Sequence, residues 1–142
     1  MLDRSVNRAY IERLALDVKR SVAIVKELTS KPYEAMSEVE KYAVRYHLIV
    51  IAEAIMAMAV HVARRAFHVE VESASHALRV LRDENLISSE ECEELLSFIR
   101  LRNLLVHRYW VIDDEKIYNH VKSDFKAVLN FVERIISYAG ES

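Results

Sequence analysis

One glycine and one proline in 142 residues leave this chain very few places to turn. A compact β-sheet protein needs many tight turns, and tight turns depend on Gly, Pro and Asn. Good helix formers dominate the composition instead, so the chain favours a small number of long helices. Its length fits a single domain, residues 1–142, whose core can be stable without disulfides or bound metals.

Apolar residues at helical spacing predict the helices themselves. Pro32 ends the first one, because proline cannot continue a helix interior. Ser37 and Ser88 each stand three residues before a glutamate, Glu40 and Glu91, which is the pattern of a capping box at a helix start. We therefore expect an all-α, up-and-down bundle of about five helices. Their expected ranges are 5–28, 38–66, 73–84, 88–107 and 115–138, with a loop at 110–114.

The second of these helices carries the run 48–60, which is apolar almost all round and contains one charged residue, Glu53. A helix of this kind is either buried or membrane-spanning. A membrane span would put the Glu53 carboxylate near the bilayer centre, where a charge is costly. We therefore expect a long central helix, covered on one side by its own bundle and on the other by a second copy of the chain. The protein should be a homodimer that does not associate with membranes.

The cysteine content, the first residues and the net charge limit the possible cellular compartment and the possible binding partners. Cys92 is the one cysteine, so the chain can form no internal disulfide and no cysteine-based metal cluster. The first residues are charged and amphipathic and contain no apolar signal core, which indicates a cytoplasmic protein. A net charge of −2 excludes broad attraction to nucleic acid, so any RNA contact must come from a local basic patch.

The end of the fourth helix gathers polar groups outside its core face. Arg100, Asn103 and His107 are spaced i, i+3, i+7 and so share one face. Arg102 and Tyr109 are seven residues apart and align if the helix continues that far. The predicted core stripe has the same spacing on a different face: Phe98, Leu101 and Leu105.

These polar groups suit the cleavage of RNA by its own 2′-hydroxyl, which attacks the adjacent phosphorus. The step needs a base for that hydroxyl, an acid for the leaving oxygen and positive charge beside the phosphorane. His107 can serve as acid or base near neutral pH, and Arg102 offers phosphate oxygens a planar fork that stays charged. No metal or cofactor is required. Because one chain supplies one well-placed histidine for two proton transfers, a two-fold dimer would place two copies of Arg102 and His107 in one cleft.

The sequence Arg102-Asn103-x-x-x-His107-x-Tyr109 resembles the R-x4-H-x-Y motif of HepT toxins, within the HEPN superfamily of helical proteins. The apolar helix with Glu53-Ala54 and the sequence 106–118 are also similar to the family pattern. The resemblance covers nearly the whole chain. It implies a HEPN bundle, usually dimeric, and a metal-independent ribonuclease toxin of a type VII toxin–antitoxin system. The partner would be a small MntA-type nucleotidyltransferase antitoxin.

The same resemblance assigns roles to single residues. Arg102 and His107 match the catalytic pair, Asn103 the polar residue that follows that arginine, and Tyr109 the tyrosine that the antitoxin adenylylates. We expect two further cations to support the RNA phosphates beside this site: Arg100 and Arg108.

Other functions and ordinary structural roles compete with this interpretation. The chain could be a non-catalytic HEPN module that holds a nucleotide or a partner, or a purely structural helical dimer. A structural protein has no need of these four polar groups at one helix end, so we rank it last. His107 could cap its helix, and Arg102 could pair with Glu93 or Glu94 at the surface. Trp110 we interpret as a packing aromatic that closes the bundle.

Two histidines near Glu53, His47 and His61, suggest a metal site, since helical bundles can hold two iron ions. Those sites use Glu-x-x-His pairs on facing helices, and this chain contains no Glu-x-x-His. We therefore expect no metal and expect Glu53 to be a buried acceptor for an arginine or a tyrosine. Cys92 follows two glutamates, which should raise the pKa of its thiol, so we do not interpret it as a nucleophile.

Overall fold

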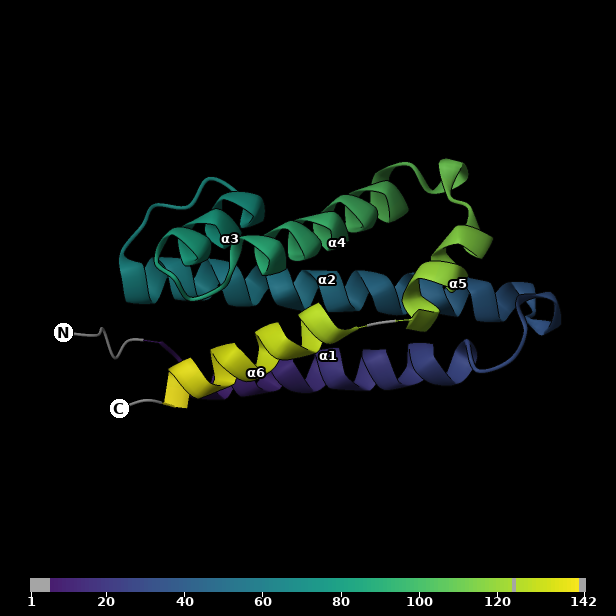
Figure 1. The fold of residues 1–142 in the computed structure, drawn as a ribbon, viewed down its shortest axis with the longest axis horizontal. Helices are drawn as coiled ribbons and strands as arrows, with labels where there is room; N and C mark the ends of the chain where they lie inside the picture. The colour runs from purple at the N-terminus through teal and green to yellow at the C-terminus, as the bar shows by residue number, and fades with distance from the viewer. Residues whose placement is uncertain (1–5, 124, 141–142) are drawn as a thin grey trace.

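The computed structural model describes residues 6–123 and 125–140, and the regular structure in these two ranges is entirely helical (Figure 1). The expected all-α fold class is confirmed. Six α-helices and two 3-10 helices follow one another through the described residues: α1 (Arg8–Leu28), η1 (Tyr33–Ala35), α2 (Glu38–Phe67), α3 (Ala74–Asp83), α4 (Ser89–His107), η2 (Tyr109–Val111), α5 (Asp114–Ser123) and α6 (Lys126–Gly140).

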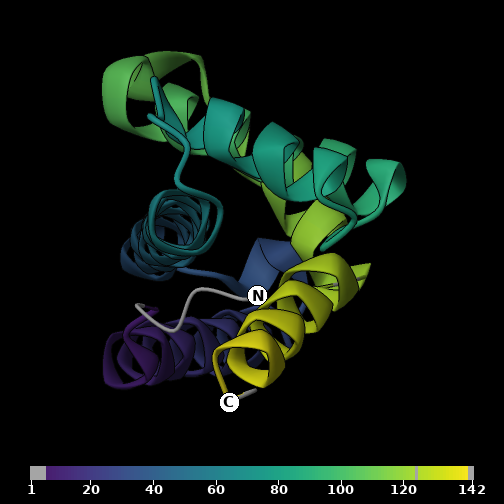
Figure 2. The same ribbon diagram turned by 90° about the vertical axis from the view of Figure 1, so that its left-hand side faces the viewer.

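Helix α2 runs through the middle of the bundle, as expected. Helices α1 and α6 pack together on one side of it, and α3 and α4 lie on the other (Figures 1 and 2). The buried stripe of α2 includes Leu48, Ile51, Ile55 and Met58, all of them almost fully buried. Burying a side chain of this size stabilises the fold by about 1.5–3 kcal/mol relative to leaving it in water, so this stripe is a main source of stability.

The local sequence determines where helices α2 and α4 begin. At the start of α2 the Glu40 N–H donates to Ser37 Oγ at 3.1 Å, and the Ser37 N–H donates to Glu40 Oε1 at 2.9 Å. Ser88 and Glu91 make the same reciprocal pair at the start of α4, at 3.0 and 2.9 Å. Both predicted capping boxes are therefore confirmed. Each satisfies two of the backbone N–H groups that a helix start leaves without partners.

The bundle leaves part of the apolar length of α2 uncovered. By length and composition α2 could cross a membrane, and 50% of its most apolar window is buried inside the structure. The outward stripe of α2 follows spacings of three and four residues and is partly or fully exposed. It consists of Tyr42, Tyr46, Ile49, Glu53, Met56 and Val60.

The predicted helix 115–138 is two helices in the structure, α5 and α6, which run in different directions (Figure 1). Val121 on α5 and Phe125 and Phe131 on the α6 side are all buried, so both helices contribute to the core. Apolar spacing along 115–138 describes one continuous helix face and carries no signal for a change of direction.

The core stripe of α4 also differs from the predicted one. Leu105 is buried as expected, but Phe98 and Leu101 are half-buried at the edge of the core. Contact with α2 and α3 instead buries the opposite part of the helix, which includes Cys92, Leu95, Leu96 and Ile99. Burial raises the pKa of the Cys92 thiol, so the expected direction is confirmed and the thiol is not activated.

Two histidines are fixed as hydrogen-bonding partners between α1 and α2. The backbone N–H of Asn7 donates to Nε2 of His61 at 2.9 Å, and the ring of Tyr10 lies 5.0 Å from the His61 ring. His47 Nδ1 lies 3.0 Å from the buried Ser21 hydroxyl. Burial lowers the pKa of both imidazoles, and the nearby charge of Arg65 lowers that of His61 further. Both rings are therefore stabilised in the neutral form.

These contacts predict that the fold loses stability as the pH falls. A histidine whose folded pKa lies below its unfolded value contributes stability at high pH, and this stability is lost as the pH falls below about 6.5. We expect the melting temperature to fall between pH 7.5 and pH 5.5. The His61→Gln variant should show a weaker dependence, since an amide oxygen can still accept from Asn7 but does not titrate. An unchanged pH dependence in a His47→Gln, His61→Gln double variant would rule out these two groups as its cause.

Candidate active site at the end of helix α4

The polar motif lies where α4 ends and the chain turns into η2. Helical backbone stops at His107, because Arg108 leaves the helical region at φ −140° and ψ 45°. Tyr109 therefore lies in η2, so the condition under which it would align with Arg102, a helix that continues to residue 109, is not met. The turn returns the chain toward α2, where Arg45 Nη1 donates to the backbone oxygen of Tyr109.

An ion pair that the sequence analysis missed holds this turn in place. Arg45 on α2 donates from Nε and Nη2 to the two carboxylate oxygens of Asp114, at 2.7 and 2.8 Å. Its Nη1 also donates to the backbone oxygen of Tyr109 at 3.3 Å. Both charged side chains are only 18% exposed, and the contact with Asp114 raises the pKa of Arg45. Arg45 was recognisable only as a cation beside an apolar run, since its partner is 69 residues away.

Arg102 is held between two acceptors. Its Nη2 donates to Glu53 Oε2 on α2 at 3.0 Å, and its Nη1 donates to Oδ1 of the neighbouring Asn103 at 3.0 Å. Its Nε is buried and has no hydrogen-bond partner within the described part of the chain. The side chain of Arg102 is 20% exposed and that of Glu53 is 53% exposed. Glu53 is thus the acceptor for an arginine that we expected, but it is not buried, and Arg102 pairs with it rather than with Glu93 or Glu94.

The remaining motif residues lie at the surface. Asn103 and His107 are exposed and one helical turn apart, so they are neighbours on one face of α4. Arg108 is exposed directly after His107. Arg100 is exposed one turn before Asn103, and its Nη2 donates to Ser97 Oγ at 2.9 Å. The structure thus brings a half-buried guanidinium and an exposed imidazole to the same helix end.

The two aromatic residues of η2 face solvent. Tyr109 is 62% exposed and Trp110 is 67% exposed, and their ring centroids are 5.5 Å apart in an edge-on arrangement. The expectation that Trp110 packs into the bundle is therefore wrong. The Arg45–Asp114 pair fixes the backbone of this segment against α2, and the side chains on the other side of η2 then point outward. The phenol of Tyr109 is accessible for a second protein or for a substrate.

A family comparison decides what kind of protein carries this site. The chain matches the family model for ribonuclease HepT-like proteins over residues 15–135. It belongs to the HepT-like family. The match contains all of α2, α4 and η2, and so the whole site. No curated protein matches this HepT-like chain in sequence.

Solved structures confirm the HEPN fold of this HepT-like chain. A tri-AMPylated HEPN toxin from Shewanella oneidensis, in complex with the MNT antitoxin, is 19% identical, with a TM-score of 0.83 over 90% of this chain and 97% of that one. The cytosolic protein YutE from Bacillus subtilis, of unknown function, is 24% identical, with a TM-score of 0.80 over 97% and 92%. A toxin–antitoxin structure with AMP-PNP is 18% identical, with a TM-score of 0.79 over 89% and 97%.

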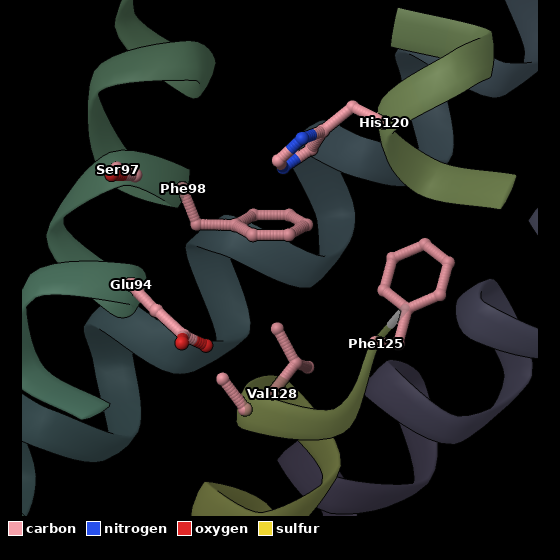
Figure 3. A pocket seen from close by; sticks show the side chains of 7 residues that line it. Glu94, Ser97, Phe98, His120, Phe125 and Val128 are labelled. Carbon is pink, nitrogen blue, oxygen red and sulfur yellow. The ribbon is translucent and has the colours of Figure 1, made fainter. Parts of the chain in front are cut away.

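The HepT-like chain also has a cavity away from the motif, between α4, α5 and the start of α6 (Figure 3). It measures about 350 Å³ and joins a neighbouring hollow of about 340 Å³. Phe98, which we expected in the core, forms part of its wall, together with Glu94, Ser97, His120, Phe125, Ala127 and Val128. None of the motif residues lines this cavity. Among the described residues no group of three or more His, Cys, Asp or Glu side chains is arranged to hold a metal ion.

Proposed function

We propose that this chain is the toxin of a HepT/MntA-like type VII toxin–antitoxin system, a metal-independent ribonuclease that is silenced by adenylylation of Tyr109. The observation that carries the proposal is the end of α4 in a HepT-like chain, where Arg102 is held by Glu53 and Asn103 and His107 is exposed five residues later. A guanidinium and an imidazole are the groups that RNA cleavage by the 2′-hydroxyl needs.

The reaction divides between these groups as follows. One His107 removes the proton of the 2′-hydroxyl, whose oxygen then forms a bond to phosphorus. Arg102 donates to the non-bridging oxygens as negative charge builds on the phosphorane. The bond to the 5′-oxygen breaks, and a second copy of His107 supplies the proton that this leaving oxygen takes up. The products are a 2′,3′-cyclic phosphate and a free 5′-hydroxyl, and Asn103, Arg100 and Arg108 would help to hold the RNA.

A homodimer supplies the second histidine. The outward stripe of α2 leaves Ile49 and Met56 partly exposed beside Tyr46, which is an unusual surface for a helix that stays in water. Glu53 belongs to this stripe and contacts Arg102, so a second copy packed along the stripe brings two α4 ends to one interface. The dimer and the composite site therefore follow from the same helix face.

The proposed partners and compartment follow from the structural neighbours. The solved complexes pair HEPN toxins with an MNT or MntA antitoxin, and one of those toxins is AMPylated. We infer an MntA-type nucleotidyltransferase as the partner of this chain. One neighbour is described as cytosolic, and we infer a cytoplasmic location here as well.

The first prediction concerns catalysis. His107→Ala and Arg102→Ala should each reduce RNA cleavage by at least about 100-fold, the usual size of a lost proton-transfer or charge-stabilising group. EDTA should have no effect, and mass spectrometry of the products should show 2′,3′-cyclic phosphate ends. Arg8→Ala, which removes an exposed arginine paired with Glu12 on α1, is the matched control and should cleave normally. Full cleavage by both site variants would place the activity elsewhere, and a wild type that binds RNA without cleaving it would favour the non-catalytic HEPN module.

The second prediction concerns assembly. Light scattering at micromolar concentration should return twice the mass of the chain. Ile49→Glu should produce a folded monomer that has lost cleavage, because the new charge would be buried without a partner in the dimer. Leu16→Glu on α1, which also replaces an exposed apolar side chain, should stay dimeric and active. A wild type with the mass of one chain would refute the composite site.

The third prediction concerns silencing. An adenylyl group on Tyr109 adds a negative phosphate that competes with RNA for Arg102, Arg100 and Arg108, and a nucleoside that fills the space RNA needs. Intact-mass spectrometry after co-expression with the antitoxin should show added AMP on the wild type and none on Tyr109→Phe, which should stay folded and resist silencing. Tyr10→Phe is the control, since Tyr10 is an exposed tyrosine on α1 outside the outward stripe of α2, and it should be modified like the wild type. AMP on another residue, or silencing of Tyr109→Phe, would refute this role for Tyr109.

A further inference from the structure

We propose that Glu53 is the positioning residue for Arg102: its carboxylate fixes the guanidinium at the end of α4 so that the remaining N–H groups are ready for RNA phosphate. This inference rests on the proposed ribonuclease function and names a residue that acts through Arg102 rather than on the substrate itself. It is carried by the contact between Glu53 Oε2 and Arg102 Nη2, which joins α2 to α4 at 3.0 Å.

An arginine side chain has many rotamers, and a catalytic guanidinium must be confined to one of them. Losing this freedom costs up to about 2 kcal/mol for a long side chain, so confinement before the substrate arrives improves the reaction. Arg102 meets this condition, because its Nε is buried and its two terminal nitrogens are held by Glu53 and Asn103. Its acceptors come from two different helices, which fixes the plane of the guanidinium as well as its position.

The contact holds Arg102 without using up its donors. A guanidinium has five N–H groups, and Glu53 and Asn103 each accept one, so each terminal nitrogen keeps a second hydrogen for phosphate. The Arg45–Asp114 pair shows the contrasting arrangement, in which two guanidinium nitrogens meet both carboxylate oxygens. Glu53 contacts Arg102 through one oxygen and one nitrogen. This geometry holds the guanidinium and leaves its other N–H groups able to bind phosphate.

The location of Glu53 supports the same conclusion. It is the one charged residue in the apolar run 48–60, where a carboxylate adds nothing to core packing. It also lies on the outward stripe of α2, which the proposed dimer covers. Burying a charge in an interface costs free energy unless the charge is paired. The ion pair with Arg102 lowers this cost for the Glu53 carboxylate. The residue therefore joins the dimer face to the candidate site.

The test is a double-mutant cycle on cleavage of a short RNA. Glu53→Ala should lower kcat/KM by about 10-fold, mainly through kcat, because the guanidinium is then mobile when the phosphorane forms. Glu53→Gln keeps an acceptor oxygen and should lose only about threefold. In the Arg102→Ala background Glu53→Ala should cost nothing further. The melting temperature should change by no more than about 3 °C, since the pair is partly exposed, and Glu12→Ala, which breaks an exposed pair on α1, should leave cleavage unchanged.

Two results of this cycle would overturn the proposal. Faster cleavage by Glu53→Ala would mean that the carboxylate blocks the fork, and a further loss in the Arg102→Ala background would mean that Glu53 acts on its own. A second measurement does not depend on cleavage and so separates this inference from the proposed function. The Nε–H signal of Arg102 in ¹⁵N NMR should report slow guanidinium rotation in the wild type and faster rotation in Glu53→Ala, even if the chain cleaves no RNA. Equal rotation in both proteins would show that Glu53 does not position Arg102.

Discussion

Arg45 donates to both carboxylate oxygens of Asp114, and this pair determines where the chain goes after α4 ends. Two charges that are only 18% exposed have lost most of their hydration, and the bidentate geometry compensates for that loss. Removing one partner of a fully buried pair costs about 3–5 kcal/mol, because the other charge is left without water or a counterion. The contact of Arg45 with the Tyr109 backbone then fixes η2 itself. It adds to the backbone hydrogen bonds of the turn itself, from Arg108 N–H to Leu104 at 2.8 Å and from Val111 N–H to Arg108 at 3.0 Å.

Glu53 makes the second polar contact between α2 and this segment, eight residues after Arg45 on the same helix. Eight residues correspond to about 12 Å along a helix axis. The pair at Arg45 holds the turn after α4, and the pair at Glu53 holds α4 itself at Arg102. Helix α2 therefore has two functions on its two sides: its buried stripe stabilises the bundle, and its polar residues position the candidate site. Since the outward stripe also carries Glu53, the proposed assembly of two copies would use the same surface that holds Arg102.

The sequence predicted what depends on neighbouring residues and missed what depends on contacts between distant ones. The capping boxes of Ser37 and Ser88 and the central place of α2 follow from local patterns, and the structure has them. The break between α5 and α6 depends on how these helices pack against the rest of the bundle. The spacing of apolar residues along the chain does not describe that packing. Trp110 was interpreted as a packing aromatic that closes the bundle, whereas in the structure the segment held at Asp114 leaves it in solvent. For the site, the motif identified Arg102, His107 and Tyr109 as candidates, but nothing near them indicated Arg45.

The candidate site combines a group fixed by folding with groups left in solvent, and this division suits a toxin that another protein must control. Arg102 can be largely enclosed, because a guanidinium keeps its charge at any pH a cell experiences. In the proposed mechanism His107 exchanges protons with substrate and water during each cycle, which its exposed place in the last turn of α4 allows. Tyr109 lies on a 3-10 turn whose backbone is held and whose side chain is free of the core, so a group attached to it need not disturb the packing of the bundle. The proposed control by modification would then act on access to the site and leave the fold intact.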